Sequence, residues 1–220
     1  PQRSSGPTSE RPLYTSWSSG RRLMRVIEAV RRELEPLNAE IRAALRPSRD
    51  ALAKFVANQL YIVPHDLKAL SAAMAKAKET DEYRFVKTLV DGDYQALQLL
   101  RELAEEVGVS FSWEALDPAA VAYTHFLSWL ALNGTMGDLA VAMTVNLPVW
   151  GENCLALARW AKEQGYKRLG FLEMFAGPYD QLEAAAEAIA QRYLDWGRYR
   201  FVAKAIQRYE LEFWRAVGTT

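Results

Sequence analysis

Apolar residues recur every three or four positions along almost the whole chain, from Leu23 to the aromatic residues near position 214. This period places them on one face of successive α-helices, whereas a half-buried strand would alternate apolar and polar residues. No segment of the sequence shows that alternation, and no internal repeat is visible. The pattern therefore predicts an all-α fold, in one bundle of about eight or nine helices.

Proline, glycine and capping residues divide this pattern into helices. We expect Pro36 to end the first helix, and Pro64 and Pro148 to kink the helices that contain them. Ser48 is typical of an N-cap, and Asp117 followed by Pro118 is typical of a helix start. The predicted helices cover residues 23–35, 37–45, 48 onward through Pro64, 81–108, 117–133 and 136–164, a short one before Gly177-Pro178, a longer one after it, and a last one carrying Tyr209–Trp214.

Composition excludes several classes of protein. The 220 residues include 27 Lys and Arg and 27 Asp and Glu, so there is no basic surplus and we expect no nucleic-acid partner. No apolar run reaches the roughly 20 residues of a membrane helix, so we expect no membrane partner. Residues 1–16 are rich in Ser, Pro and Arg and are predicted to form a flexible arm ahead of one helical domain, residues 17–220. The single Cys154 favours a cytoplasmic location.

The last predicted helix carries a carboxylate among aromatic residues. Residues three and four apart share a helix face, which places Glu210 beside Phe213 and Trp214. A glutamate walled by aromatic rings tends to keep its proton, which suits a general acid or a hydrogen-bond partner for a heterocycle. The structural alternative is an amphipathic terminal helix with Glu210 at its rim.

Four segments together resemble one known family. They are Asn58–His65, Tyr123–Phe126 followed by Asn133-Gly134, Val145–Glu152, and Tyr209–Trp214. In order and spacing they resemble the TenA (thiaminase II) family over residues 23–217. The resemblance implies the haem-oxygenase-like helical bundle that this family shares with PqqC and the CADD-like proteins. It also implies a small heterocyclic ligand, related to aminopyrimidines or thiamin, and we expect a homo-oligomer, either a dimer or a tetramer.

The resemblance assigns roles to individual positions. Glu210 corresponds to the general acid of the family, and Phe213 to the aromatic residue one turn later. Tyr123, Trp150 and Phe175 correspond to aromatic residues of the pocket, although Phe175 lacks the hydroxyl group that many members have there. These positions imply an aromatic-lined cavity with one buried carboxylate.

Two positions depart from the thiaminase branch. Asn146 stands where that branch has its nucleophilic Cys, and Gln59 stands where it has the Asp that binds the pyrimidine amino group. An amide cannot become a thiolate, so thiaminase II chemistry is not expected. Cys154 lies about two helical turns further on and is predicted to be a packed core thiol. Asn146 and Gln59 can instead donate and accept hydrogen bonds to a nitrogen heterocycle.

Metal and cofactor chemistry find little support in the sequence. The chain has two histidines, His65 and His125, and neither follows a carboxylate at helical spacing, so we expect no metal. No Gly-rich phosphate loop is present, and we expect no cofactor. Three classes remain: a Cys-independent aminohydrolase or salvage enzyme with Glu210 as acid/base, a PqqC-like cofactorless oxidase, and a ligand-binding or regulatory protein without catalysis.

Overall fold

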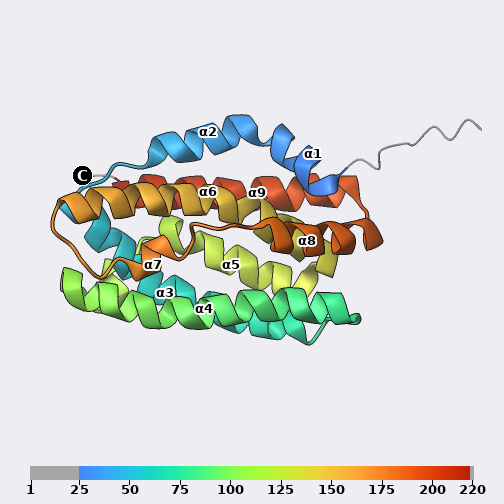
Figure 1. Cartoon of the computed structure of the whole chain (residues 1–220), viewed down its shortest axis with the longest axis horizontal. Helices are drawn as coiled ribbons and strands as arrows, with labels where there is room; N and C mark the ends of the chain where they lie inside the picture. Colours follow the sequence, from blue (N-terminus) through green and yellow to red (C-terminus); the bar gives the residue numbers. More distant parts are fainter. Residues whose placement is uncertain (1–24, 219–220) are drawn as a thin grey trace, which may run out of the picture.

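The computed structural model describes residues 25–218. These residues form nine α-helices and one short 3-10 helix, and none of them lies in a strand (Figure 1). The all-α prediction is therefore confirmed, while the predicted arm, residues 1–16, lies outside the described residues. The helices are α1 (Val26–Glu33), α2 (Glu35–Ala44), α3 (Arg49–Met74), α4 (Thr80–Val107), η1 (Trp113–Ala115), α5 (Pro118–Asn133), α6 (Met136–Glu163), α7 (Gly170–Glu173), α8 (Asp180–Arg192) and α9 (Trp196–Gly218).

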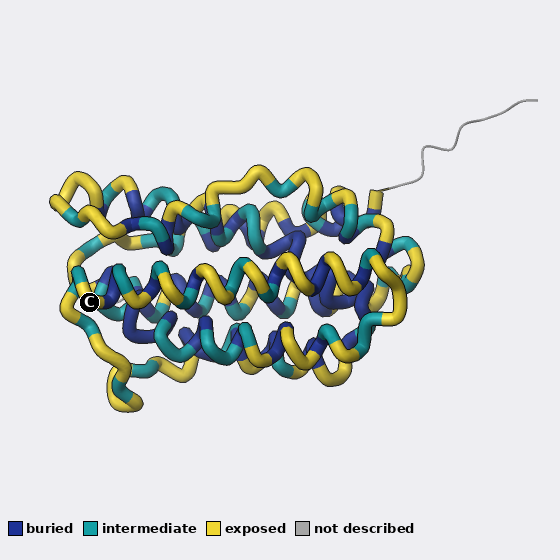
Figure 2. Tube along the Cα trace, turned by 60° about the horizontal axis from the view of Figure 1, so that its bottom comes forward, coloured by how far each residue is buried: buried dark blue, intermediate teal, exposed yellow. Residues whose placement is uncertain are grey.

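The long helices lie side by side along the long axis of the molecule (Figure 1). Helix α3 packs on α4 and α5, α5 packs on α9, and α6 packs on α8 and α9, while α1 and α2 cover the opposite side from α4. Buried positions form stripes that face the interior (Figure 2), and they join into one hydrophobic core. No described helix is both long enough and apolar enough to cross a membrane.

Local signals explain most helix starts. Ser48 caps α3 and Asp117 caps α5 with their side chains, as predicted. The predicted start of α4 at Asp81 was wrong by one residue, because α4 begins at Thr80 and Glu79 is its N-cap. The Glu79 side chain accepts from the backbone N–H of Glu82, and the Glu82 side chain accepts from that of Glu79, so two free donors are satisfied together.

The prolines act differently along the chain. Helix α1 ends at Glu33, and Pro36 lies in the first turn of α2, where its missing N–H carries no penalty. Helices α3 and α6 continue through Pro64 and Pro148. Next to Pro64, the imidazole Nδ1 of His65 lies 2.7 Å from the backbone oxygen of Tyr61, so the His65 side chain contacts the backbone of the helical turn that contains Pro64.

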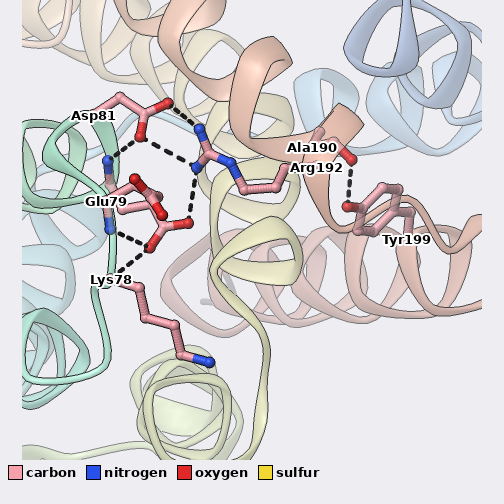
Figure 3. Close-up of polar contacts among 7 residues, drawn as sticks. Lys78, Glu79, Asp81, Ala190, Arg192 and Tyr199 are labelled. Atoms are coloured by element: carbon pink, nitrogen blue, oxygen red, sulfur yellow. Dashed lines mark hydrogen bonds and ion pairs between the residues drawn. The ribbon is translucent and has the colours of Figure 1, made fainter.

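An arginine joins the end of α8 to the start of α4 (Figure 3). The Arg192 guanidinium lies 2.7 Å from an Asp81 oxygen and 2.8 Å from an oxygen of Glu82, whose side chain is fully buried. Nearby, the Tyr199 hydroxyl donates to the backbone oxygen of Ala190 at 2.7 Å. These contacts join α8 to α4 and α9 to α8 at one end of the bundle.

Candidate functional site

A cavity lies inside the bundle, where side chains of α3, α4, α5, α6 and α9 meet the segment after α7. It offers about 60 Å³ to the centres of water-sized molecules, against the roughly 10–15 Å³ that one water requires. The cavity can therefore hold a few waters or one small ring. Its lining consists of Gln59, Ile62, Asp93, Tyr123, Met143, Asn146, Leu147, Trp150, Phe175, Glu210 and Phe213.

All seven residues that the sequence singled out contribute to this lining, although they come from five separate segments. They are Gln59 of α3, Tyr123 of α5, Asn146 and Trp150 of α6, Phe175 after α7, and Glu210 and Phe213 of α9. The structure thus brings these side chains around one cavity. Their part in ligand binding or catalysis stays a prediction.

Glu210 is held in a fixed orientation within the cavity wall. Its side chain is almost fully buried, with 1% of the residue exposed. The indole Nε1–H of Trp214, one turn later on α9, donates to Oε1 at 3.2 Å, and the Asn146 amide of α6 donates to Oε2. Each carboxyl oxygen therefore accepts one hydrogen bond and keeps a further lone pair, with which the carboxyl group can bind a proton or a ligand.

A chain of buried amides extends from the carboxyl group into the core. The Asn146 amide nitrogen also donates to Gln207 Oε1 at 2.8 Å, and Gln207 donates in turn to Asn38 Oδ1 at 2.7 Å. At the other end, the Tyr123 hydroxyl donates to Asn146 Oδ1 at 3.3 Å. Each amide has one donor end and one acceptor end, so these contacts fix the orientation of Asn146, with its nitrogen toward Glu210.

Burial dominates the electrostatics of Glu210. It raises the pKa of this carboxyl group to about 8, although the hydrogen bonds from Trp214 and Asn146 act in the opposite direction. Burial likewise holds the pKa of Tyr123 well above its usual value, with the nearby carboxyl groups adding to the effect. Near neutral pH, Glu210 therefore exchanges a proton readily, whereas Tyr123 stays a neutral hydroxyl.

Aromatic rings form the rest of the wall. The Trp150 ring lies 5.8 Å from Phe175 and 5.4 Å from Phe213, in edge-to-face arrangements in both cases. Gly151 allows the segment after α7 to approach α6 this closely, because a methyl group there would overlap the backbone oxygen of Phe175. Edge-to-face rings at these distances leave flat surfaces suited to a planar ligand.

Sequence reasoning missed a second carboxyl group in the cavity. Asp93 of α4 contributes to the lining, and its Oδ2 is buried without a hydrogen-bond partner within the described residues. Asp66 of α3 is also buried, and its Oδ1 lacks a partner in the same part of the chain. Burial raises the pKa of Asp93 to about 7. The pKa of Asp66 is held well above its usual value, mainly by burial and in addition by the nearby charge of Asp93.

A sequence signal for Asp93 and Asp66 was present. Asp93 lies four residues after Leu89 and seven before Leu100, in phase with the buried stripe of α4. Asp66 lies four residues after Ile62, in phase with the buried face of α3. A carboxylate at a core position of an amphipathic helix is rarely buried without a purpose.

Two other predictions about α6 can be compared with the structure. Cys154 is fully buried and does not contribute to the cavity lining, and burial holds its pKa well above the usual value. The prediction of a packed core thiol is confirmed. Glu152, which is half exposed, pairs with Arg42 and does not belong to the cavity lining, as its position nearly opposite Trp150 on a helix predicts.

Both histidines lie apart from the cavity lining. The Tyr61 hydroxyl lies 3.1 Å from His125 Nε2, and the Tyr61 ring stacks on His65 with a 4.0 Å separation. Neither belongs to a ligand group, since residues 25–218 contain no group of three or more His, Cys, Asp or Glu side chains that could hold a metal ion. Their contacts are those of an aromatic cluster between α3 and α5.

Solved structures with the same arrangement of helices include a TenA homologue from Pyrococcus furiosus. It is 20% identical, with a TM-score of 0.68, over 87% of this chain and 98% of that one. A TenA family transcription regulator from a Silicibacter species is also 20% identical, with a TM-score of 0.65, over 88% and 96% of the two chains. Comparison with curated proteins gave no match. A family model matches residues 46–219, and the chain belongs to the TENA/THI-4/PQQC family.

Proposed function

We propose that the chain binds a small aromatic nitrogen heterocycle, of the aminopyrimidine or thiamin-related class, in its aromatic cavity, and that Glu210 serves as acid and base in hydrolysis of a C–N bond. The observation that carries the proposal is the buried carboxyl group of Glu210, which lines the cavity and accepts hydrogen bonds from Trp214 and Asn146. A pKa of about 8 suits a group that must both give and take a proton near neutral pH.

In the proposed step, water replaces an amine on the ring carbon. Neutral Glu210 gives its proton to the departing nitrogen while the water oxygen forms a bond to carbon. The C–N bond breaks, and one proton of the attacking water passes to the Glu210 carboxylate while the other stays on the new hydroxyl group. One water is consumed, one amine is released, and the carboxyl group ends the cycle protonated as it began.

The lining favours this reaction over the alternatives that the sequence left open. A PqqC-like oxidase acting on a larger aromatic substrate would need several His and Arg side chains in the cavity, but no Lys, Arg or His belongs to its lining within residues 25–218. Asn146 stands at the nucleophile position of the thiaminase branch and contributes hydrogen bonds to Glu210 and Gln207. These contacts support a carboxylate mechanism without a covalent thiol step.

The test combines ligand identification with one substitution. Native mass spectrometry of the purified protein should detect a retained heterocycle, and release of amine from candidate aminopyrimidines should be measurable. Glu210→Gln should retain ligand binding and lose turnover by about 10² to 10⁴, because an amide cannot transfer the proton. Full turnover in that variant would remove Glu210 from the mechanism. Binding without turnover in the unmodified protein would instead establish a ligand-binding protein.

The cytoplasmic location and the homo-oligomer that we expected from the sequence stay predictions. Sedimentation of the purified protein would settle the second.

A further inference from the structure

We propose that Gln207 of α9 and Asn38 of α2 are positioning residues, which hold Asn146 so that the proton of neutral Glu210 is presented to the cavity. The inference rests on the proposed function, because the direction of this proton matters for catalysis only if Glu210 acts as an acid. Gln207 and Asn38 lie behind the cavity lining, and Asn38 acts through Gln207, which in turn contacts Asn146.

Both hydrogen bonds that Glu210 accepts come from donors in the cavity wall. The Trp214 indole can only donate, so it cannot accept the proton of neutral Glu210. Asn146 presents its amide nitrogen, which is also a donor. Since these two are the only hydrogen-bond partners of Glu210 among residues 25–218, its proton is left for the cavity that it lines.

A reversed Asn146 would have the opposite effect. The two ends of an amide are nearly equal in size, so Asn146 could turn its oxygen toward Glu210 and accept the proton there. The proton would then be held in the wall and withheld from a ligand. Tyr123 does not prevent this reversal, because its hydroxyl can accept from the amide nitrogen as well as donate to the oxygen.

Gln207 and Asn38 oppose the reversal. Gln207 Oε1 lies 2.8 Å from the Asn146 nitrogen, and a reversed Asn146 would place two oxygens against each other there. The Gln207 nitrogen donates in turn to Asn38 Oδ1 at 2.7 Å. Both residues are buried, so a lost partner would not be replaced by bulk water. Asn146 can therefore reverse only if all three amides turn together.

The other titratable groups around Glu210 do not produce this effect. From α3 to α6 they are Asp66, Asp93, Tyr123, Glu152 and Cys154. Burial raises the pKa of the tyrosine hydroxyl and of the cysteine thiol, so both stay neutral where Glu210 titrates. On α1 and α2, the acidic groups beside α9 are exposed and pair with its arginines.

NMR titration of the glutamate side-chain carboxyl carbons tests the inference on the full chain without a substrate. Selective glutamate labelling leaves Asp93 silent, and Glu210→Gln identifies the Glu210 signal by its loss. Gln207→Met should raise the titration midpoint of Glu210 by about 0.5–1 pH unit, because only neutral Glu210 can donate to a reversed Asn146. Asn38→Leu should shift it in the same direction, since it leaves a buried nitrogen of Gln207 unpaired unless Gln207 turns toward Asn146.

Asn153→Leu is the matched control. Asn153 is a buried amide of α6 that also bonds to α2, through the backbone oxygen of Ile41, but within residues 25–218 no hydrogen bond joins it to Glu210. Its Glu210 midpoint should equal that of wild type. An equal shift in this control, or a midpoint that stays or falls in Gln207→Met, would overturn the inference. If Gln207→Met does not fold, the midpoint in Asn38→Leu decides by the same criterion.

Turnover separates the failure of this inference from that of the proposed function. In the amine-release assay, Gln207→Met should lower kcat by about three- to tenfold with KM unchanged, because a reversed Asn146 competes for the proton. Asn153→Leu should leave kcat unchanged. A shifted midpoint in Gln207→Met, with no turnover by the wild type, would refute the proposed function and leave the role of Gln207 in place. Turnover with an unshifted midpoint would do the reverse.

Discussion

Replacing Glu210 by Gln should change the pH dependence of stability by a large amount. A carboxyl group whose pKa is raised on folding holds its proton longer in the folded state than in the unfolded state. The contribution of Glu210 to the free energy of unfolding is fully present below pH 4.5, and it is lost as the pH rises toward about 8. Since one pKa unit corresponds to about 1.4 kcal/mol, this loss amounts to roughly 5 kcal/mol over the whole range.

The glutamine has a different balance of effects. It cannot ionise, so the loss between acid and alkaline pH disappears. It does, however, place an NH₂ group opposite either the Trp214 N–H or the Asn146 amide, both of which donate to Glu210. One mismatched donor costs about 1–3 kcal/mol. The variant should therefore be less stable than wild type near pH 4.5 and more stable near pH 9.

Urea denaturation at a series of pH values measures both effects. The difference in the free energy of unfolding between Glu210→Gln and wild type should change sign between these limits. Glu212→Gln is the matched control, because Glu212 lies on the exposed side of the same helix and pairs with Arg215. Its profile should run parallel to that of wild type. A parallel profile for Glu210→Gln as well would refute the claim that burial raises the pKa of Glu210.

Three further results are expected. The wild type should not cleave thiamin in a product assay, because Asn146 cannot form a thiolate, and robust cleavage would contradict this. Gly151→Ala should lower the free energy of unfolding by about 1–3 kcal/mol in urea denaturation through overlap with the segment after α7, whereas Gly92→Ala, with open space around it, should not lower it. Arg192→Met should lower the free energy of unfolding by about 1–3 kcal/mol in the same measurement, since the Glu82 carboxylate stays buried without its partner. Lys87→Met, which breaks an exposed ion pair, should change stability little. Equal effects of the two substitutions would argue against the α4–α8 contact.

Local signals in the sequence predicted most of the fold. Ser48 and Asp117 cap their helices because short polar side chains satisfy the first free N–H groups, a purely local effect. The start of α4 was misplaced because a glutamate at position 79 is a less common N-cap than the aspartate at 81. Gly177-Pro178 separates α7 from α8 as expected, since neither residue favours a continuing helix.

The cavity could be predicted only in part. Spacing within α9 places Glu210 beside Trp214, but its contact with Asn146 joins residues 64 positions apart and depends on how α6 packs against α9. Family resemblance supplied that long-range information for seven positions. It supplied none for Asp93, whose place in the cavity lining can be seen only when α4 is placed beside α3. The amides of Gln207 and Asn38 escaped notice for the same reason, since each is hydrogen-bonded to a residue of a distant helix.

The fixed donor-to-acceptor direction of the hydrogen bonds around Asn146 has a consequence for product release. The Tyr123 hydroxyl donates its hydrogen bond to Asn146, so toward the cavity it offers only lone pairs. Together with Asp93, it makes part of the wall an acceptor surface. An amine presents protons to such a surface, but the carbonyl oxygen that would replace it after hydrolysis presents lone pairs. A reaction that replaces the amine by a carbonyl group would therefore give a product that the cavity binds more weakly than the substrate, and this difference would favour product release.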